Sequence, residues 1–493
     1  MKLLSEITAQ LQDPVITGNA SIMVRSLTMD SRSVSPGALY VAIKGLHADG
    51  HNFIADAIAN GAGVIVCETL PGEISGEITY VEVKDSATAL GLIASVFYGD
   101  PSTELTLIGI TGTNGKTTIA TLLHETFTSL GFRCGLISTI RYHDGIDDTD
   151  ASHTTPDALR LQQIIRDMVE NGCDYCFMEV SSHAVVQKRI AGLTFAGGIF
   201  TNLTHDHLDF HPTFDDYLKA KQAFFTSLPK HAFALVSKDD RNGMVMVQQS
   251  RARVYTYSTT TMADFHAKVI ENTIDGLHLD LGGSRVWFRL TGAFNARNIA
   301  AVYGAAMLLQ ADDQEVLEVL SSLEPVEGRF QQFRGPDGVI AIVDYAHTPD
   351  ALKNVLETIR DVNREEGRVV TVVGAGGDRD PFKRPLMARI ASSFSDHVIL
   401  TSDNPRTEPP EKILQEMQQG LDSAGKRKSL TITDRREAIR AAVMMATDGD
   451  IVLIAGKGHE KYQEINGIRH PFDDMAVVQE AMDQKSINTQ DKP

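Results

Sequence analysis

The sequence predicts an α/β protein with three domains, of which the central and C-terminal ones are each built on a largely parallel sheet. A chain of 493 residues is too long to fold around one hydrophobic core, and a prior of about 150 residues per domain gives about three domains. Apolar runs typical of buried strands alternate with helix-compatible stretches, as in parallel sheets with helices on both faces. Turn-rich breaks at 99–102 and 324–329 divide the chain. We therefore expect domains at 1–100, 101–328 and 329–493.

Each domain has its own expected elements. The first has a strand at 37–43 and helices near 53–60 and 87–97. The second alternates strand and helix in the order 105–110, 119–130, 135–139, 157–171 and 175–180. The third has strands at 339–343, 369–373, 397–401 and 451–455, separated by helical stretches. Both later domains therefore follow a doubly wound pattern, and the polar tail from Asp483 on is expected to fray.

Composition and charge limit the classes of partner and the cellular compartment that we expect for this protein. The hydrophobic fraction of 42% supports packed domains, and the net charge of −18 argues against a nucleic-acid or membrane-surface role. An anionic small substrate needs only local cations. The cysteines are sparse, the N-terminus lacks the pattern of a signal peptide, and no apolar run is long enough to span a bilayer. We expect a cytoplasmic protein without membrane insertion.

Cys173 and Cys176 form a lone C-x-x-C pair. A zinc site would need a second pair, and none is present. Buried packing is therefore favoured over metal or redox chemistry.

The segment 109–118 is the most informative stretch of the chain. An apolar run enters it, a helix-compatible run leaves it, and Gly112 and Gly115 let the backbone curl so that N–H groups converge. Lys116 brings a mobile cation and Thr117 a hydroxyl suited to Mg²⁺. The pattern departs from the strict phosphate loop, because Ile110 stands where the first glycine belongs. An ordinary glycine-rich turn is the alternative, but the order of strand, loop, Lys-Thr and helix favours triphosphate binding.

Other polar residues follow predicted strands or open predicted helices. Glu179 ends a strand, where it either meets a metal ion or remains a carboxylate without a ligand. The segment 202–211 holds three His and two Asp; zinc is possible, but a loop lining a phosphate–magnesium site fits at least as well. Lys219 and Lys221 lie on different faces of a helix, so at most one points into a given site. Asn295 and Asn298 share a helix face, where they read an adenine edge or cap the helix.

Four polar, turn-rich loops follow strands of the third domain, at 344–349, 374–380, 402–406 and 456–460. Loops after parallel strands meet at the carboxyl edge of the sheet. Their convergence favours a binding crevice for a charged ligand.

The residues of these motifs, and their order along the chain, resemble those of one protein family. They are T-G-T-N-G-K-T-T (111–118), E-V-S-S-H (179–183), D-H-L-D-F-H (206–211), F-N-A-R-N (294–298), D-Y-A-H-T-P (344–349), G-G-D-R-D (376–380), D-N-P-R (403–406) and G-K-G-H-E (456–460). The chain resembles the Mur ligases of peptidoglycan synthesis, and among them the MurE type, which adds the third residue of the stem peptide. The first motif is shared with the folylpolyglutamate synthetases, whereas the last three narrow the resemblance to MurE.

The resemblance implies an N-terminal UDP-binding domain, a central ATP-binding P-loop domain and a C-terminal Rossmann-like domain that brings the amino acid. It implies ATP, Mg²⁺, the substrate UDP-N-acetylmuramoyl-L-alanyl-D-glutamate and a monomeric enzyme. The γ-carboxylate of D-glutamate attacks ATP to give an acyl phosphate, and the incoming amine then displaces phosphate. Such chemistry needs cations to bring two anions together, and domain closure to keep water from the activated acyl group.

The resemblance also assigns residues. Those at the catalytic centre are Lys116, Lys221, His207 and Glu179. The Mg²⁺ ligands are Thr117, Glu179, His207 and Lys221, the last as a carbamate. The nucleotide contacts are Gly112, Thr113, Asn114, Gly115, Lys116, Thr117, Thr118, Asn298, Arg329 and Asp344. The UDP contacts are Met29, Ser31, Leu46, His47 and Ala48. The muramoyl-dipeptide contacts are Thr154, Thr155, Ser181, Gln187 and Arg189. The amino-acid contacts are Arg379, Asp403, Asn404, Pro405, Arg406, Gly456 and Glu460.

Arg406 favours meso-diaminopimelate as the added amino acid. A guanidinium clasps the second carboxylate of diaminopimelate, whereas it would repel the terminal ammonium of L-lysine. The alternatives are the L-lysine-adding ligase and, more distantly, a folylpolyglutamate synthetase, which should lack the N-terminal UDP domain and the D-N-P-R loop. A non-catalytic nucleotide switch belongs to another class, and it would have no use for the converging C-terminal loops.

Overall fold

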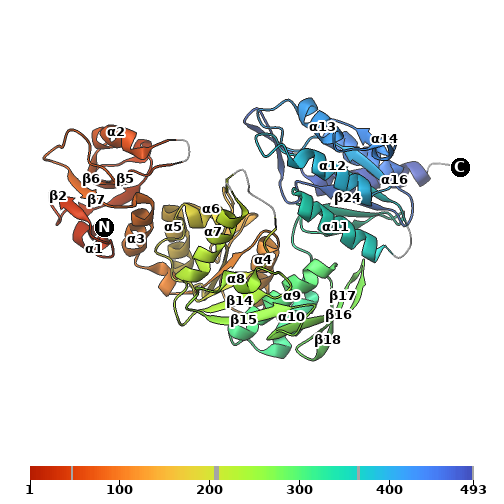
Figure 1. Cartoon of the computed structure of the whole chain (residues 1–493), viewed down its shortest axis with the longest axis horizontal. Helices are drawn as coiled ribbons and strands as arrows, with labels where there is room; N and C mark the ends of the chain where they lie inside the picture. The colour runs from red at the N-terminus through yellow and green to blue at the C-terminus, as the bar shows by residue number, and fades with distance from the viewer. Residues whose placement is uncertain (46–47, 205–209, 212, 364–366, 491–493) are drawn as a thin grey trace.

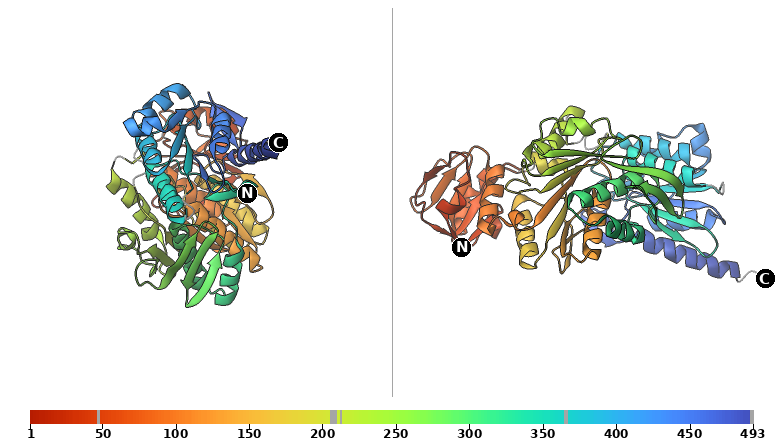
Figure 2. Two further views of the ribbon diagram at one scale, coloured as in Figure 1. Left: turned by 90° about the vertical axis from the view of Figure 1, so that its right-hand side faces the viewer. Right: turned by 90° about the horizontal axis from the view of Figure 1, so that it is seen from below.

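Three α/β domains follow one another along the long axis of the molecule, which confirms the predicted fold class (Figures 1 and 2). The structure is a computed structural model that describes residues 1–45, 48–204, 210–211, 213–363 and 367–490. Among these residues, no helix is both long and apolar enough to cross a membrane.

The N-terminal domain contains a five-stranded sheet in the order β2-β7-β6-β5-β4. Alternate side chains of its central strands face opposite sides: Leu39 and Val41 pack toward α1 and α3, whereas Tyr40 and Ala42 pack toward α2. The elements are β1 (Lys2–Leu3), α1 (Leu4–Ile7), β2 (Val15–Thr17), β3 (Met23–Val24), β4 (Ser26–Thr28), η1 (Ser31–Ser33), β5 (Ala38–Val41), η2 (Gly50–Phe53), α2 (Ile54–Ala59), β6 (Ala62–Cys67), β7 (Thr79–Glu82) and α3 (Ser86–Tyr98).

Helix α3 joins this domain to the central one. A Cβ at Gly91 would lie 2.4 Å from the carbonyl oxygen of Ala191, so only glycine allows the two backbones to come this close. Ser95 Oγ donates to the carbonyl of Gly192 at 2.9 Å.

The central domain holds an 11-stranded sheet in the order β11-β10-β9-β12-β8-β13-β14-β15-β16-β17-β18. Helices α4, α9 and α10 cover one face, and α5 and α7 cover the other. The elements are η3 (Pro101–Thr103), β8 (Thr106–Thr111), α4 (Lys116–Ser129), β9 (Cys134–Ile137), β10 (Arg141–His143), β11 (Asp148–Asp150), α5 (Ala158–Glu170), β12 (Tyr175–Glu179), α6 (Ser182–Val186), β13 (Gly197–Phe200), α7 (Phe214–Ser227), β14 (Phe233–Ser237), α8 (Gly243–Met246), β15 (Arg253–Ser258), β16 (Phe265–Thr273), β17 (Gly276–Leu281), β18 (Ser284–Phe288), α9 (Ala293–Leu308) and α10 (Asp313–Ser322).

This sheet is parallel from β9 to β16, as expected, but antiparallel at both ends. Strand β17 shows why: Leu277, Leu279 and Leu281 are buried, while the residues between them are partly exposed. Such alternation suits an antiparallel strand with one solvated face. The strand-helix repeat in the sequence did not reveal these flanks.

The four cysteines are free and buried. Burial raises the pKa of the Cys173 thiol to about 11 and that of Cys176 well above its ordinary value. Both thiols therefore stay protonated, which confirms the packing interpretation of the C-x-x-C pair.

The C-terminal domain contains a six-stranded sheet in the order β19-β20-β24-β21-β22-β23, parallel except for β19. Helices α11, α12 and α13 cover one face, and α15 and α16 cover the other. The elements are β19 (Gln331–Arg334), β20 (Ile340–Asp344), α11 (Pro349–Val362), β21 (Val369–Val373), α12 (Lys383–Phe394), β22 (His397–Leu400), α13 (Pro410–Gln418), α14 (Ser423–Arg427), β23 (Ser429–Thr431), α15 (Arg435–Met445), β24 (Ile451–Ala455), β25 (Tyr462–Ile465), β26 (Ile468–Pro471) and α16 (Asp474–Gln490).

The polar tail is helical, contrary to the expectation of fraying from Asp483 on. Helix α16 continues to Gln490 because Lys485 anchors it: the ammonium donates to the carbonyl of Ala446 and pairs with Asp337, both at 2.6 Å.

Candidate active site

The loop between β8 and α4 has the geometry of an anion cradle. A Cβ at Gly112, where φ is +152°, would lie 1.8 Å from the Thr201 hydroxyl, which explains why the glycine stands here rather than at Ile110. Gly115, with φ +88°, is the N-cap of α4 and offers no side chain to the first-turn amides. Those N–H groups therefore point out of the helix end, where an anion binds well.

The end of β13 holds this loop in place. Thr113 N–H donates to the carbonyl of Asn202 at 2.8 Å, and Asn114 N–H donates to the side-chain oxygen of Asn202 at 2.9 Å. Thr201 Oγ1 donates to the carbonyl of Asn114 at 2.6 Å. The cradle is thus held by backbone and side-chain hydrogen bonds within the central domain.

Two lysines approach the same carbonyl of the loop. Lys116 Nζ donates to Gly112 O at 3.0 Å and to Thr113 O at 2.9 Å. Lys221 is buried, and its Nζ donates to Gly112 O at 2.9 Å. Lys219, by contrast, is exposed and pairs with Asp215 at 2.6 Å. The structure therefore confirms that the two lysines of α7 face different sides.

Glu179 lies at the same edge of the sheet as the loop, because β12 runs parallel to β8 with Glu179 beside Ile110. Its carboxylate is fully buried and accepts from Thr139 N at 2.7 Å and from Thr139 Oγ1 at 3.2 Å. The described residues contain no group of three or more His, Cys, Asp or Glu side chains arranged to hold a metal ion.

The residues expected to hold the muramoyl dipeptide are joined by hydrogen bonds beside Glu179; they are Thr154, Thr155, Ser181, Gln187 and Arg189. Thr155 Oγ1 donates to the carbonyl of Glu179 at 2.7 Å and accepts from Ser181 N at 3.1 Å. Arg189 donates to Thr155 O at 2.6 Å and to Gln187 Oε1 at 2.7 Å and 3.0 Å. Thr154 Oγ1 lies 3.0 Å from the Thr139 hydroxyl.

Asn298 lies against the phosphate loop. Its side-chain oxygen would be 2.7 Å from a Cβ at Gly115, so the loop glycine makes room for it. Asn298 Nδ2 donates to Asn295 Oδ1 at 3.0 Å, and Asn295 donates to Thr291 O at 2.8 Å. The N-cap of α9 is Gly292, so the capping explanation of Asn295 is wrong.

Arg329 reaches across from the start of the C-terminal domain. Its guanidinium donates to Thr117 Oγ1 at 3.2 Å and lies 4.5 Å from the ring centroid of Tyr345. Asp344 accepts from Phe330 N at 2.7 Å and from Ala346 N at 2.8 Å. Burial raises the pKa of Asp344 to about 6, against the opposing effects of Arg329 and the two N–H groups.

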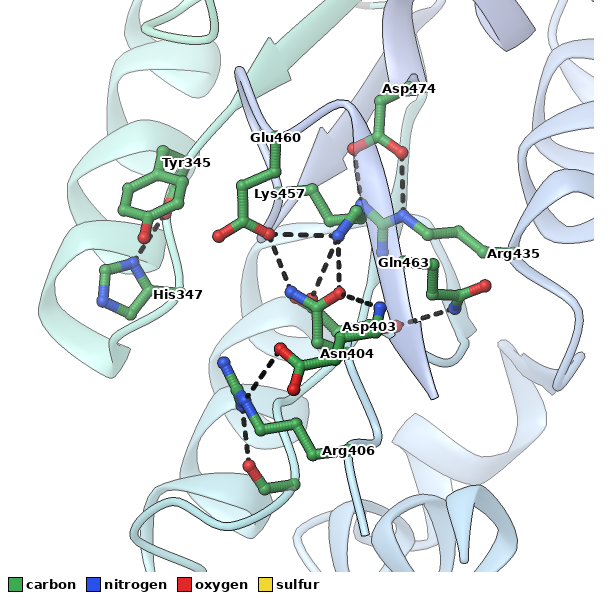
Figure 3. Close-up of polar contacts among 12 residues, drawn as sticks. Tyr345, His347, Asp403, Asn404, Arg406, Arg435, Lys457, Glu460, Gln463 and Asp474 are labelled. Carbon is green, nitrogen blue, oxygen red and sulfur yellow. Dashed lines mark hydrogen bonds and ion pairs between the residues drawn. The ribbon is translucent and has the colours of Figure 1, made fainter. Parts of the chain in front are cut away.

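The four C-terminal loops converge as the sequence predicts. Strands β20, β24, β21 and β22 end in register, with Asp344 beside Ala455, Ala455 beside Val373, and Val373 beside Leu400. Figure 3 shows the side chains that meet at this edge.

Within this group Asn404 Nδ2 donates to Glu460 Oε2 at 2.7 Å, and a Cβ at Gly456 would lie 2.6 Å from the Asp403 carboxylate. Burial works to raise the pKa of Asp403, but the cations Lys457 and Arg435 hold it below its ordinary value.

Arg406 has a left-handed backbone, with φ 50°, fixed by bonds to strand β25. Its N–H donates to Glu464 O at 3.0 Å. Its guanidinium donates to Gly377 O at 2.7 Å and lies 3.8 Å from the Glu464 carboxylate. Pro405 packs against Gly377, where a Cβ would lie 1.9 Å from the Pro405 carbonyl, and Arg379 is exposed nearby.

The expected UDP contacts lie in the N-terminal domain, which is at the opposite end of the molecule from the C-terminal domain (Figure 1). Met29 and Ala48 are exposed, and Ser31 is buried with its carbonyl accepting from Asn60 at 2.9 Å. Leu46 and His47 lie outside the described residues, as does His207 of the central domain.

Several residues at this site carry no role in the sequence-based assignment: Thr139, Asp350, Lys457 and His459. Asp350, on α11, accepts from Asn114 Nδ2 at 3.1 Å and from Thr204 Oγ1 at 3.0 Å, so it ties the C-terminal domain to the phosphate loop. His459 lies beside Arg329 and Tyr345, and burial, with Arg329 adding to it, lowers its pKa to about 3. The G-K-G-H-E motif contains two of these residues, but nothing local to it shows their burial.

Known proteins match the chain along its length. The Mur ligase family model described as the catalytic domain matches residues 23–98, the Mur ligase middle domain matches 110–306, and the Mur ligase glutamate ligase domain matches 328–458.

Two curated relatives bear the name UDP-N-acetylmuramoyl-L-alanyl-D-glutamate–2,6-diaminopimelate ligase. The one from Cytophaga hutchinsonii is 53% identical and covers 95% of this chain and 96% of its own. The one from Bacteroides thetaiotaomicron is 52% identical, with 97% and 99% covered. A solved structure of an enzyme of the same name is 35% identical, covers 98% of this chain and 99% of its own, and has a TM-score of 0.70.

A glycine-rich loop with Lys116 on the central sheet and a cluster of charged side chains on the C-terminal sheet agree with a nucleotide-dependent ligase. The chain belongs to the Mur ligase family. Members of this family are ATP-dependent enzymes that join an acid to an amino acid.

Proposed function

We propose that this chain joins meso-2,6-diaminopimelate to UDP-N-acetylmuramoyl-L-alanyl-D-glutamate, with ATP as the energy source, in peptidoglycan synthesis. The observation that carries the proposal is a link between two domains: the phosphate loop of β8–α4 is tied through Arg329 and Asp350 to the domain that contains Arg406. The names of the full-length relatives support the same reaction.

The central cradle takes the triphosphate in this proposal. The first-turn amides of α4 hold phosphate oxygens, Lys116 balances their charge, and Asn298 beside Gly115 reads adenine. Arg329, which already reaches Thr117, contacts phosphate, and Asp344 the ribose.

Oxygen ligands near the cradle fit Mg²⁺, which prefers such ligands and keeps several waters. Thr117 and Glu179 supply a hydroxyl and a carboxylate at one sheet edge, and His207 with a carbamate on Lys221 completes the proposed set. A bound Mg²⁺ would neutralise the charge of the phosphates.

The acceptor substrate extends from the N-terminal domain, residues 1–100, to the cradle. Met29, Ser31 and the loop 46–48 hold the UDP moiety, and the Thr155–Arg189 group holds the muramoyl dipeptide. Its free carboxylate then reaches the γ-phosphate held by the central domain, 101–328. The resulting acyl phosphate lies between this domain and the C-terminal one, 329–493, where enclosure keeps water away until the amine attacks.

The C-terminal crevice selects the amino acid. Arg406 can contact a carboxylate of the bound amino acid in this proposal. Its separation of 3.8 Å from Glu464 is longer than a close ion pair, so the guanidinium can also bind a substrate carboxylate. Diaminopimelate offers that carboxylate, whereas L-lysine offers an ammonium.

Phosphate release measured with ATP, Mg²⁺ and the UDP-dipeptide tests the proposal, scanned over diaminopimelate isomers, L-lysine and L-ornithine. We expect sustained release only with meso-diaminopimelate. Release with L-lysine would identify the lysine-adding ligase, and release without the UDP-dipeptide would indicate a nucleotide switch.

We place the enzyme in the cytoplasm, where the reducing environment suits its free thiols, and expect a monomer on gel filtration.

A further inference from the structure

Lys457 is a fully buried lysine at the centre of the amino-acid crevice. Its ammonium donates to Asn404 Oδ1 at 2.9 Å and to Glu460 Oε2 at 3.0 Å, and it lies 3.8 Å from the Asp403 carboxylate (Figure 3). A buried lysine is rare unless it is paired, so these contacts account for its charge.

These hydrogen bonds orient Asn404 and Glu460, which are two of the residues proposed to bind the amino acid. The Asn404 oxygen faces the ammonium and also accepts from Glu464 N at 2.9 Å, so the Asn404 amide nitrogen must point to Glu460. Glu460 Oε2 accepts from both Lys457 and Asn404. Without the ammonium, Asn404 Oδ1 would lose one of its two donors and Glu460 Oε2 would lose its cation, so both side chains would be held less firmly.

A second buried cation does not replace Lys457. Arg435 makes a bidentate pair with Asp474, from Nε at 2.8 Å and from Nη2 at 2.7 Å, and both side chains are fully buried. Lys457 is therefore the close cation for Asp403 and Glu460. One ammonium facing two carboxylates leaves an excess negative charge, which suits an incoming ammonium group.

We propose that Lys457 is a positioning residue that acts through Glu460 and Asn404 to set the affinity for the incoming amino acid. This inference rests on the proposed function of the crevice. A purely structural lysine would stabilise the domain without a selective effect on one substrate. A positioning lysine changes the KM for the amino acid and leaves those for ATP and the UDP-dipeptide unchanged.

The first test compares K457M with the matched control K485M, which removes a partly buried, ion-paired lysine of α16 in the same domain. For K457M we expect the KM for diaminopimelate to rise about 30-fold or more, with the other two KM values within about twofold. K485M should change none of the three. Equal changes in all three KM values, or none, would overturn the proposal. If K457M does not fold, K457Q is measured with the same criterion.

A mutant cycle with E460Q tests whether Lys457 acts through Glu460. We expect K457M to raise the KM less in the E460Q background than in the wild type, because the contribution through Glu460 is already lost while that through Asn404 remains. Additive losses would overturn the proposal. Failure of the wild-type enzyme to use diaminopimelate would instead count against the proposed function, so the two failures are distinguishable.

Discussion

Two lysine ammonium groups donate to one carbonyl, that of Gly112, at 3.0 Å for Lys116 and 2.9 Å for Lys221. Like charges at this spacing repel each other, most strongly where burial lowers the local dielectric. An anion bound in the cradle would reduce this repulsion, and so would conversion of one lysine to an anion. Both agree with the proposed chemistry, and each gives a test.

Replacing Lys116 by alanine should abolish ligation and leave the fold intact. Its charge meets the negative charge that develops on the transferring phosphoryl group, and loss of such a group costs about 10²-fold or more in rate. The measurement is steady-state phosphate release together with circular dichroism. Near-normal turnover by a folded K116A enzyme would refute the phosphate assignment.

Replacing Lys221 by alanine should remove most activity, and formate or acetate should restore part of it. A carbamate on the buried amine would supply a carboxylate, and a small acid can fill the vacant position. The control is K219A, which removes the exposed neighbour paired with Asp215. K221A should impair acyl-phosphate formation more than nucleotide binding. Clear crystal density for an unmodified Lys221 ammonium pointing to solvent, in active enzyme with Mg²⁺ bound, would contradict the carbamate.

Replacing Arg406 by alanine should raise the KM for diaminopimelate steeply and leave that for ATP almost unchanged. Loss of a charge-assisted contact to a substrate carboxylate should cost about 2–5 kcal/mol. R389A, at an exposed site on α12, is the control. If the wild-type enzyme used L-lysine as well as diaminopimelate, this role of Arg406 would be wrong.

Helix α4 connects the phosphate loop to the interior of the central domain. Its buried His124 packs edge-on against His143, with ring centroids 5.1 Å apart. Burial, and then the neighbouring His143 and Arg141 side chains, lower the pKa of His124 to about 4. The helix that presents the cradle thus contains an imidazole that must remain neutral for the fold to be stable.

This pKa predicts that acid weakens the central domain. Because the folded pKa is below the ordinary value of about 6.5, the contribution of His124 is complete above pH 6.5 and is lost as the pH falls toward 4. The loss reaches about 3 kcal/mol. When the pH is lowered from 7 to about 5, the melting temperature of H124F should therefore fall less than that of the wild type, as measured by calorimetry. H231Q, at an exposed histidine, should follow wild type; an H124F curve parallel to wild type would refute the account.

At the scale of the whole molecule, Asp350 joins two domains. It lies in the first turn of α11 and accepts from Asn114 of the phosphate loop and from Thr204. Arg329 makes a second link, to Thr117. The approach of the C-terminal domain is thus coupled to the loop that holds the nucleotide.

D350A should loosen this approach. We expect a larger radius of gyration by small-angle X-ray scattering and a kcat about tenfold lower, because the amino-acid loops face the acyl phosphate less often. D361A, near the other end of the same helix and exposed, should match wild type on both measures. Identical behaviour of D350A and D361A would show that the bond does not hold the domains.

Local patterns determined a large part of this protein. The strand, the glycines, Lys116 and Thr117 of the cradle all lie within residues 106–117, so their geometry follows from the sequence. Four strands of the C-terminal sheet, β20, β21, β22 and β24, were predicted from apolar runs, and their loops do meet at one edge, whereas β19 and β23 were not predicted. Parallel strands impose that convergence whatever the details of packing.

Tertiary structure alone decided the remaining features. The burial of Lys457, the pairing of Asp350 with Asn114 and the meeting of two lysines at Gly112 join residues far apart in the chain. No local periodicity encodes these contacts, because they depend on how sheets and domains pack. The antiparallel flanks β10–β11 and β17–β18 were missed for a related reason: partners at a sheet edge are set by the packing of the sheet as a whole. The sequence by itself therefore determined which chemically active residues the chain contains, and the packing of three domains decided which of their side chains meet in one site.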